Sequence, residues 1–115
     1  MKLIIAAAPG ERRFSALVHA IGAFNIKADD VTVVVSDGTH PLAAMWAGMI
    51  GKPLRRFECN PQIYGFAASK TRNIQMCSFA EALLILTPSK PGSLAHLLQT
   101  AERMGLRVMA HPVGS

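Results

Sequence analysis

The sequence predicts a single α/β domain whose parallel sheet is covered by helices on both faces. Short apolar segments alternate along the chain with helical segments of about ten residues, which is typical of parallel β-α-β units. Residues 31–35 are apolar almost throughout, as expected for a strand buried on both faces. The chain has 115 residues, half of them hydrophobic, so residues 1–115 are expected to fold as one domain around a substantial core.

The first half of the chain is predicted to contain three strands separated by two helices. The first apolar segment is broken by Pro9 and Gly10, and a helical spacing of apolar residues at i, i+3, i+4 and i+7 then begins at Phe14. The next helix stops at Gly51, a common helix terminator. The expected elements are strands at residues 2–7, 31–35 and 53–58 and helices at residues 12–24 and 41–50.

The second half of the chain is predicted to add two helices and two strands. Residues 60–68, which include Pro61 and Gly65, are expected to form a loop long enough to carry function. A later helix has Leu94 at the start of its apolar face and stops at Gly105. The expected elements are helices at residues 69–79 and 94–104 and strands at residues 82–87 and 106–110.

The charge balance favours anionic partners. The formal net charge is +5 and the pI is about 9.8, a balance that suits nucleotides, nucleic acid or an acidic surface. The basic residues fall into separate small groups, however, and no lysine-rich tail is present. A solvated basic surface is therefore an equally good explanation, and nucleic acid is the less favoured partner.

Cysteine and histidine usage predicts a cytoplasmic protein without a metal site. The two cysteines, Cys59 and Cys77, cannot form a disulfide framework and are interpreted as reduced thiols. The four histidines form no metal-binding spacing with them, so neither a metal nor another cofactor is expected. The apolar segments are too short to span a bilayer, and the apolar start is better explained as a first strand than as a signal peptide.

Three glycine-containing turns should meet where the parallel strands end. They cover residues 8–12, 36–40 and 87–93, and each follows a strand and precedes a helix. Backbone N–H groups at such turns bind phosphate, and glycine permits close approach. The residues expected to contact a ligand are Gly10, Arg12, Ser36, Asp37, Gly38, Thr39, Arg72, Asn73, Lys90, Gly92 and Ser93. Alternatively, these turns are ordinary strand-to-helix connections.

Individual roles remain open for the polar residues of this set. Arg72 can pair with a phosphate or carboxylate and Asn73 can bind a base or ribose edge, or the two can tie residues 60–68 to the sheet. No residue set identifies a catalytic site, and Asp37 and His40 are the candidates. Asp37 can bind a ribose hydroxyl, act as a base or stabilise an Asx turn, and His40 can act in proton transfer or lie at the surface.

The chain lacks the G-x-G-x-x-G and G-x-x-x-x-G-K-[ST] motifs, which argues against an ordinary NAD dehydrogenase and a P-loop NTPase. Several segments resemble the SLOG superfamily of nucleotide-binding domains instead, within it the YspA and cpYpsA-related group. The resemblance runs from about Val31 to Val108. Its motifs are Val35-Ser36-Asp37-Gly38-Thr39, Gly51-Lys52-Pro53-Leu54-Arg55-Arg56-Phe57, Arg72-Asn73-Ile74-Gln75-Met76 and Gly92-Ser93.

This resemblance implies a Rossmann-like three-layer α/β/α domain with a five-stranded parallel sheet in the order 3-2-1-4-5. It also implies binding of a nucleotide or nucleotide-derived small molecule at the carboxyl edge of the sheet, by a sensor or a processing protein. Two alternatives remain: hydrolysis of an N-glycosidic or phosphate bond in a nucleotide, and binding of single-stranded DNA. The small size and apolar helices further predict a homo-oligomer.

Overall fold

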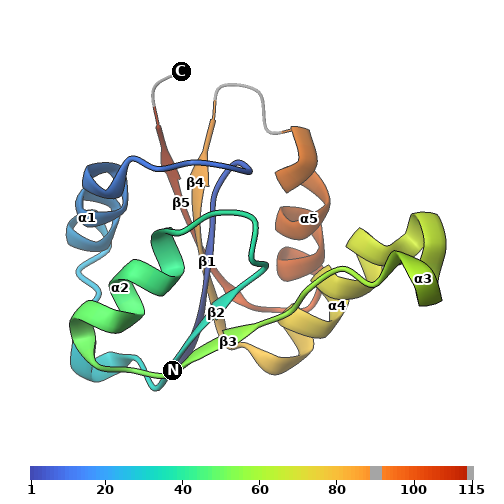
Figure 1. Ribbon diagram of the computed structural model, residues 1–115. Coiled ribbons are helices and arrows are strands. Elements are labelled where there is room, and N and C mark those ends of the chain that lie inside the picture. Colours follow the sequence, from blue (N-terminus) through green and yellow to red (C-terminus); the bar gives the residue numbers. More distant parts are fainter. Residues whose placement is uncertain (89–91, 114–115) are drawn as a thin grey trace.

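The computed structural model describes residues 1–88 and 92–113 and contains a five-stranded, entirely parallel sheet (Figure 1). Its strand order is β3-β2-β1-β4-β5, which confirms the expected arrangement. Strand β1 is central and pairs with β2 and β4, placing Leu3 beside Val34 on one side and Ala82 on the other. The strands are β1 (Lys2–Ala6), β2 (Val33–Ser36), β3 (Leu54–Arg56), β4 (Ala82–Thr87) and β5 (Arg107–Pro112).

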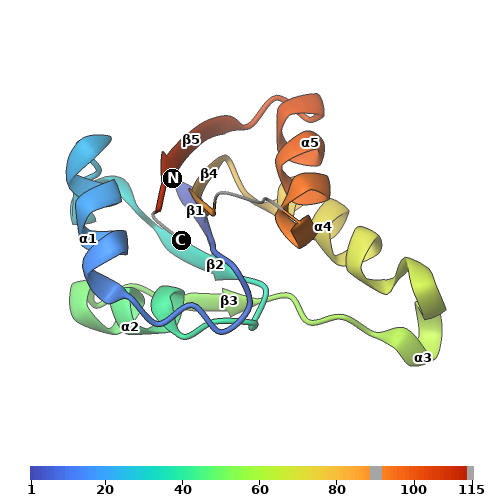
Figure 2. The ribbon, with the colours of Figure 1, turned by 90° about the horizontal axis from the view of Figure 1, so that it is seen from above.

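Two pairs of helices cover the two faces of this sheet. Helices α1 (Phe14–Ala23) and α2 (Leu42–Ile50) lie on one face. Helices α4 (Ala68–Phe79) and α5 (Ala95–Arg103) lie on the other, as the view along the strands shows (Figure 2). The molecule is therefore a three-layer α/β/α structure of the Rossmann-like type, as predicted.

Each face of the sheet has its own hydrophobic cluster because successive strand residues point to opposite sides. In β1, Leu3 and Ile5 pack with Leu17 of α1 and Leu42 of α2. The alternate residue Ile4 belongs to the second cluster, whose buried members on the helices include Met76, Cys77, Leu97 and Ala101. Because β1 is packed on both faces, it holds the loop that follows it in a fixed position at the carboxyl edge of the sheet.

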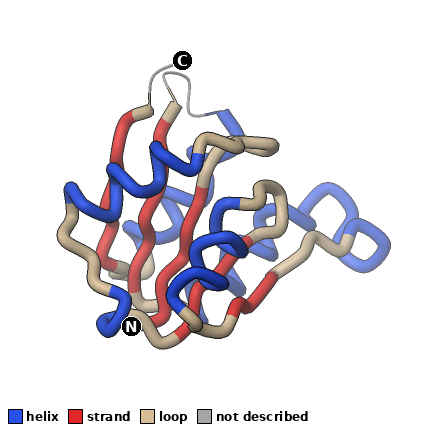
Figure 3. Tube along the Cα trace, turned by 60° about the vertical axis from the view of Figure 1, so that its left-hand side comes forward, coloured by secondary structure: helices blue, strands red, loops and turns tan. Residues whose placement is uncertain are grey.

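Residues 60–68 differ most from the expectation, because they form short helices rather than a loop. Helix α3 (Pro61–Tyr64) and the 3₁₀ helix η2 (Gly65–Ala67) run directly into α4. Asn60 caps α3, since its Oδ1 accepts a hydrogen bond from the backbone N–H of Ile63 at 3.3 Å. Pro61 occupies the first turn, where its missing N–H costs nothing. This segment stands away from the body of the molecule (Figure 3).

The remaining differences are small shifts at element ends. Strand β3 pairs only through Leu54–Arg56, because its single neighbour β2 has already ended at Ser36. Strand β5 instead extends to Pro112 and follows β4 to its end at Thr87. Two further 3₁₀ helices, η1 (Ala28–Asp30) and η3 (Gly92–Leu94), precede β2 and α5. In the described ranges no helix is long and apolar enough to cross a membrane.

Candidate functional site

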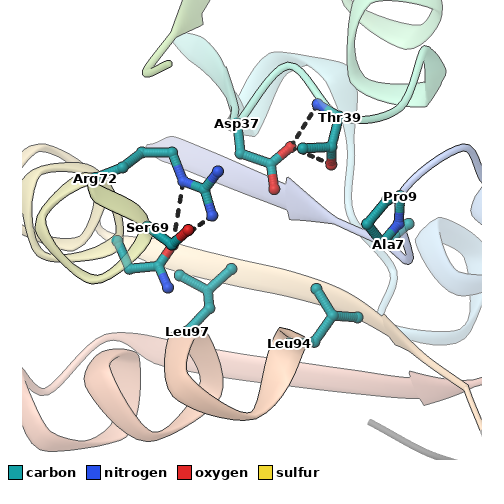
Figure 4. Close-up of a pocket in the computed structure, with 9 residues that line it drawn as sticks. Ala7, Pro9, Asp37, Thr39, Ser69, Arg72, Leu94 and Leu97 are labelled. Carbon is teal, nitrogen blue, oxygen red and sulfur yellow. Dashed lines mark hydrogen bonds between the residues drawn. The ribbon is translucent and has the colours of Figure 1, made fainter. Parts of the chain in front are cut away.

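A pocket of about 150 Å³ lies at the carboxyl edge of the sheet (Figure 4). Four parts of the chain build it: the loops after β1 and β2, the first half of α4, and the end of η3 with the first turn of α5. In open α/β sheets this edge, where the crossovers reverse direction around the first strand, is the usual ligand site. The lining residues are Ala7, Pro9, Asp37, Thr39, Ser69, Arg72, Asn73, Leu94 and Leu97.

The turn after β2 is closed by hydrogen bonds from its own side chains. The Ser36 hydroxyl oxygen, which is buried, accepts from the backbone N–H of Gly38 at 3.0 Å. Asp37 Oδ1 accepts from the backbone N–H of Thr39 at 2.9 Å and from the Thr39 hydroxyl at 2.7 Å. The Asx-turn interpretation of Asp37 is therefore confirmed. Its second carboxylate oxygen points toward the pocket (Figure 4).

The expectation that these turns offer unpaired backbone N–H groups to an anion is wrong at three positions. The N–H groups of Gly38 and Thr39 bind the side chains just described, and that of Gly10 donates to the Thr39 carbonyl at 2.9 Å. The glycines are needed for a different reason, because Gly10 and Gly38 have φ angles of 77° and 81°. A ligand in this pocket would therefore meet side chains rather than these backbone groups.

Arg72 and Asn73 act together on the other side of the pocket. Asn73 Oδ1 accepts from Arg72 Nε at 3.3 Å and from one terminal nitrogen at 3.1 Å. The other terminal nitrogen donates to Cys59 Sγ at 3.0 Å. Three of the five guanidinium N–H groups are thereby used, and two remain for a ligand. The Arg72 guanidinium and the Asp37 carboxylate point toward one another from α4 and the loop after β2 (Figure 4), and the described residues form no ion pair there.

Asn73 is buried and joins α4 to α5. Its Nδ2 lies 3.0 Å from His96 Nδ1, so with Oδ1 accepting from Arg72 the amide donates to the histidine. His96 Nδ1 is then the acceptor, and a neutral ring carries its proton on Nε2. Burial lowers the pKa of His96, and the positive charges of Lys70 and Arg103 lower it further. Asn73 thus has a structural role, but it joins α4 to α5 instead of tying residues 60–68 to the sheet, and it also lines the pocket.

His40 is buried, so its interpretation as a surface histidine is wrong. Its Nε2 lies 3.1 Å from the Ile5 carbonyl and its Nδ1 accepts from the backbone N–H of Leu42 at 3.3 Å. Burial lowers the pKa of His40, although Asp37 and the Ile5 carbonyl act in the opposite direction. A neutral His40 therefore ties the turn after β2 to β1 and to Leu42, the first residue of α2, with both ring nitrogens engaged.

The predicted contact residues separate into two groups on either side of the β2 turn. Asp37, Arg72 and Asn73 line the pocket, and Thr39 lines both sites. The other group surrounds an open depression of about 320 Å³ beside the start of α2. That depression, called here the arginine depression, is lined by Gly10, Arg12, Gly38, Thr39, His40, Pro41 and Arg56.

The third predicted turn is only partly described. Lys90 lies outside the described residues. Gly92 and Ser93 belong to η3, whose last residue, Leu94, lines the pocket. Leu94, which the sequence assigned to the next helix, is the described residue through which this region reaches the pocket, so the meeting of the turns at residues 36–40 and 87–93 stays a prediction.

Several lining residues carried no usable signal in the sequence. The sequence pattern predicts Leu94 and Leu97 to be ordinary core residues of an amphipathic helix. It predicts Ala7 and Pro9 to lie at the end of a strand. Arg56 follows Arg55, and only the structure separates them: Arg55 stacks on the Phe57 ring at 4.9 Å, whereas Arg56 lines the arginine depression. Alternation along β3 is the one signal that could have distinguished the two.

No protein-family model, curated protein or solved structure matches this chain. Among the described residues, no group of three or more His, Cys, Asp or Glu side chains is placed to hold a metal ion. The geometry of the pocket and the charges that face it therefore indicate what the protein does.

Proposed function

We propose that the pocket binds a nucleotide or a nucleotide-derived small molecule. The observation that carries this proposal is that Asp37 and Arg72 line one pocket at the carboxyl edge, from different elements and each with bonding capacity left. The free Asp37 oxygen can accept from a ribose hydroxyl. The two remaining Arg72 N–H groups can donate to a phosphate, a geometry that guanidinium groups suit.

The size of the pocket limits what it encloses. Its volume of about 150 Å³ is smaller than the roughly 300–1,000 Å³ of most small-molecule sites. A ribose or one phosphate fits inside, and the rest of a nucleotide would extend out over the rim. Leu94, Leu97 and Pro9 offer an apolar wall for the sugar or the base.

Binding is the proposed activity rather than hydrolysis. Both ring nitrogens of His40 are engaged with the backbone, so this residue has none left to exchange a proton with a substrate. The resemblance to the SLOG superfamily agrees with a binding role, since Arg72 and Asn73 of its most specific motif both line the pocket. Membership of that superfamily is part of the proposal.

The proposal also covers location and assembly. Cys59 and Cys77 are both free thiols, which suits a reducing cytoplasm. A homo-oligomer is proposed because the protruding α3–η2 segment exposes Ile63 by 71%, Tyr64 by 42% and Phe66 by 110% of their reference areas. Exposed apolar residues gathered on one segment mark interaction surfaces.

The central test is calorimetric titration of the parent and Arg72→Ala with adenosine, guanosine, cytidine and uridine monophosphates. We expect the variant to bind at least about tenfold more weakly, since a charge-assisted phosphate contact contributes roughly 1.5–3 kcal/mol. Arg107→Ala is the matched control, because Arg107 begins β5 at the opposite edge of the sheet. Circular dichroism checks that each variant is folded.

Equal affinity in the parent and Arg72→Ala would contradict the assignment of Arg72, and no binding across the panel would contradict the proposed function. Chromatography of the same samples reports released base or phosphate, the signature of the hydrolase alternative. Salt-sensitive binding of a single-stranded oligonucleotide would instead favour the nucleic-acid alternative.

A further inference from the structure

We infer that the arginine depression is a second anion subsite, which makes the ligand a nucleotide that carries a diphosphate. This inference rests on the proposed function, because it assigns the sugar-proximal part of that ligand to the pocket and the distal phosphate to the depression. The two sites are adjacent, since Thr39 lines both. A ligand reaching over the β2 turn would therefore occupy both.

Two cationic side chains from separate parts of the chain supply the charge. Arg12 lies in the loop after β1 and Arg56 ends β3, and both are exposed. Neither side chain has a recorded partner among the described residues. Their sequence neighbours differ: Arg13 pairs with Glu11 at 2.9 Å, and Arg55 stacks on the rings of Phe57 and Phe79.

The lining of the arginine depression lacks a side chain at two positions. Gly10 and Gly38 both line the depression. A Cβ at Gly10 would have nothing within 4 Å, and one at Gly38 would meet only Glu58 Cγ, at 3.9 Å. At these two positions the lining is backbone alone, and a phosphate can approach it there without displacing a side chain.

Three carboxylates near this site oppose an anion to different extents. Glu11 is compensated by Arg13, whose hydrogen bonds lower the pKa of Glu11 to about 2. Asp37 is bound to Thr39 and also lines the pocket. Glu58, close to Gly38, has no recorded partner in the described part of the chain and is the carboxylate whose removal should strengthen anion binding.

The first experiment titrates the protein with inorganic pyrophosphate by calorimetry at low ionic strength. We expect Arg12→Gln and Arg56→Gln each to weaken binding by about fivefold or more, and Arg107→Gln, the matched control, to change it by less than about twofold. Glu58→Gln should tighten binding by about two- to fivefold, since it removes a like charge. Equal affinity in Arg56→Gln and Arg107→Gln would overturn the inference, as would failure of the parent to bind pyrophosphate.

A second experiment separates this inference from the proposed function. It compares adenosine monophosphate and diphosphate in the parent, Arg56→Gln and Arg72→Gln. We expect the parent to bind adenosine diphosphate about tenfold more tightly than the monophosphate. Arg56→Gln should bind both nucleotides with the parent's affinity for the monophosphate. Arg72→Gln should bind both nucleotides more weakly than the parent does.

The outcomes are distinguishable. If the parent and both variants bind the monophosphate and the diphosphate equally well, the anion subsite is contradicted, whereas the assignment of the pocket is not. Arginine-dependent pyrophosphate binding without any nucleotide binding would remove the proposed function and keep the anion subsite.

Discussion

Asn73 illustrates how one buried polar side chain organises the site. It accepts from Arg72 and donates to His96, so its amide links α4 to α5 and holds the guanidinium over the pocket. The sequence identified Arg72 and Asn73 as a pair, but it did not predict that Asn73 would hold Arg72 in place. A contact between residues 73 and 96 depends on how two helices pack, which residue spacing along the chain does not reveal. Arg72 is therefore the better candidate for ligand contact, and Asn73 for positioning it.

His40 predicts a loss of stability as the pH falls. Burial lowers its pKa in the folded protein below the ordinary value of 6.5 that it has in the unfolded chain. Below about pH 6.5 the unfolded chain gains a proton that the folded one does not, so the free energy of unfolding decreases. One such group contributes up to about 1.4 kcal/mol per pH unit. Urea unfolding between pH 7.5 and 5.5 measures the slope.

His40→Gln supplies the comparison for this slope. It removes the titrating ring and keeps a side-chain N–H for the Ile5 carbonyl. We expect a lower free energy of unfolding at pH 7.5 together with a shallower pH dependence. His96→Gln is run in parallel because the pKa of His96 is also lowered. An unchanged slope in His40→Gln would show that His40 titrates normally in the folded protein.

At the scale of elements, the strands and long helices follow from the sequence, whereas the α3–η2 segment does not. The hydrophobic pattern predicted all five strands and the four main helices, with ends within about three residues of those in the structure. A helical period can be detected only over several turns. Helix α3 has four residues, too few for a period, and Pro61 and Gly65 read as loop residues. Its signal was the capping pair Asn60-Pro61, which marks a helix start.

Removing the Asn60 cap should loosen α3 without affecting the rest of the molecule. The Ile63 N–H bonds to both the carbonyl and the side chain of Asn60. Asn60→Ala is therefore expected to speed amide exchange at Ile63 by about fivefold, since a cap contributes roughly 1 kcal/mol. The free energy of global unfolding should not change, because α3 is exposed. Amide hydrogen exchange followed by NMR measures both quantities.

Asn60→Asp is the matched variant, because a carboxylate can accept the same hydrogen bond. We expect its exchange rates to match those of the parent. If Asn60→Ala also matches the parent, the segment is held by contacts other than this cap.

At the scale of the whole molecule, the charge and composition of the chain say little about where a ligand binds. The three-layer architecture could be expected, because strands that alternate with helices and are joined by right-handed crossovers leave few topologies. The position of the arginine depression could not, since it depends on which way Arg12 and Arg56 point after the sheet has formed. The sequence also did not predict the Ser36 hydrogen bond that helps to close the β2 turn, although it did suggest the Asp37 one.

Phe66 should control self-association if the α3–η2 segment is an interface. Phe66→Ser removes a fully exposed ring, so we expect a shift from oligomer to monomer with little change in the free energy of unfolding. Met49→Ser is the control, because Met49 is 70% exposed on α2, away from this segment. Sedimentation velocity at several concentrations measures the mass. A monomeric parent, or equal masses for all three proteins, would contradict the proposed assembly.

The contrast between the two cysteines has a practical consequence. Cys59 is exposed and lies against Arg72 at the rim of the pocket, whereas Cys77 is buried and its thiol has a pKa raised to about 11. A maleimide dye should therefore attach at Cys59 alone, without any engineering. The unaltered chain thus carries its own attachment point for a fluorescent reporter beside the residue on which ligand capture is proposed to depend.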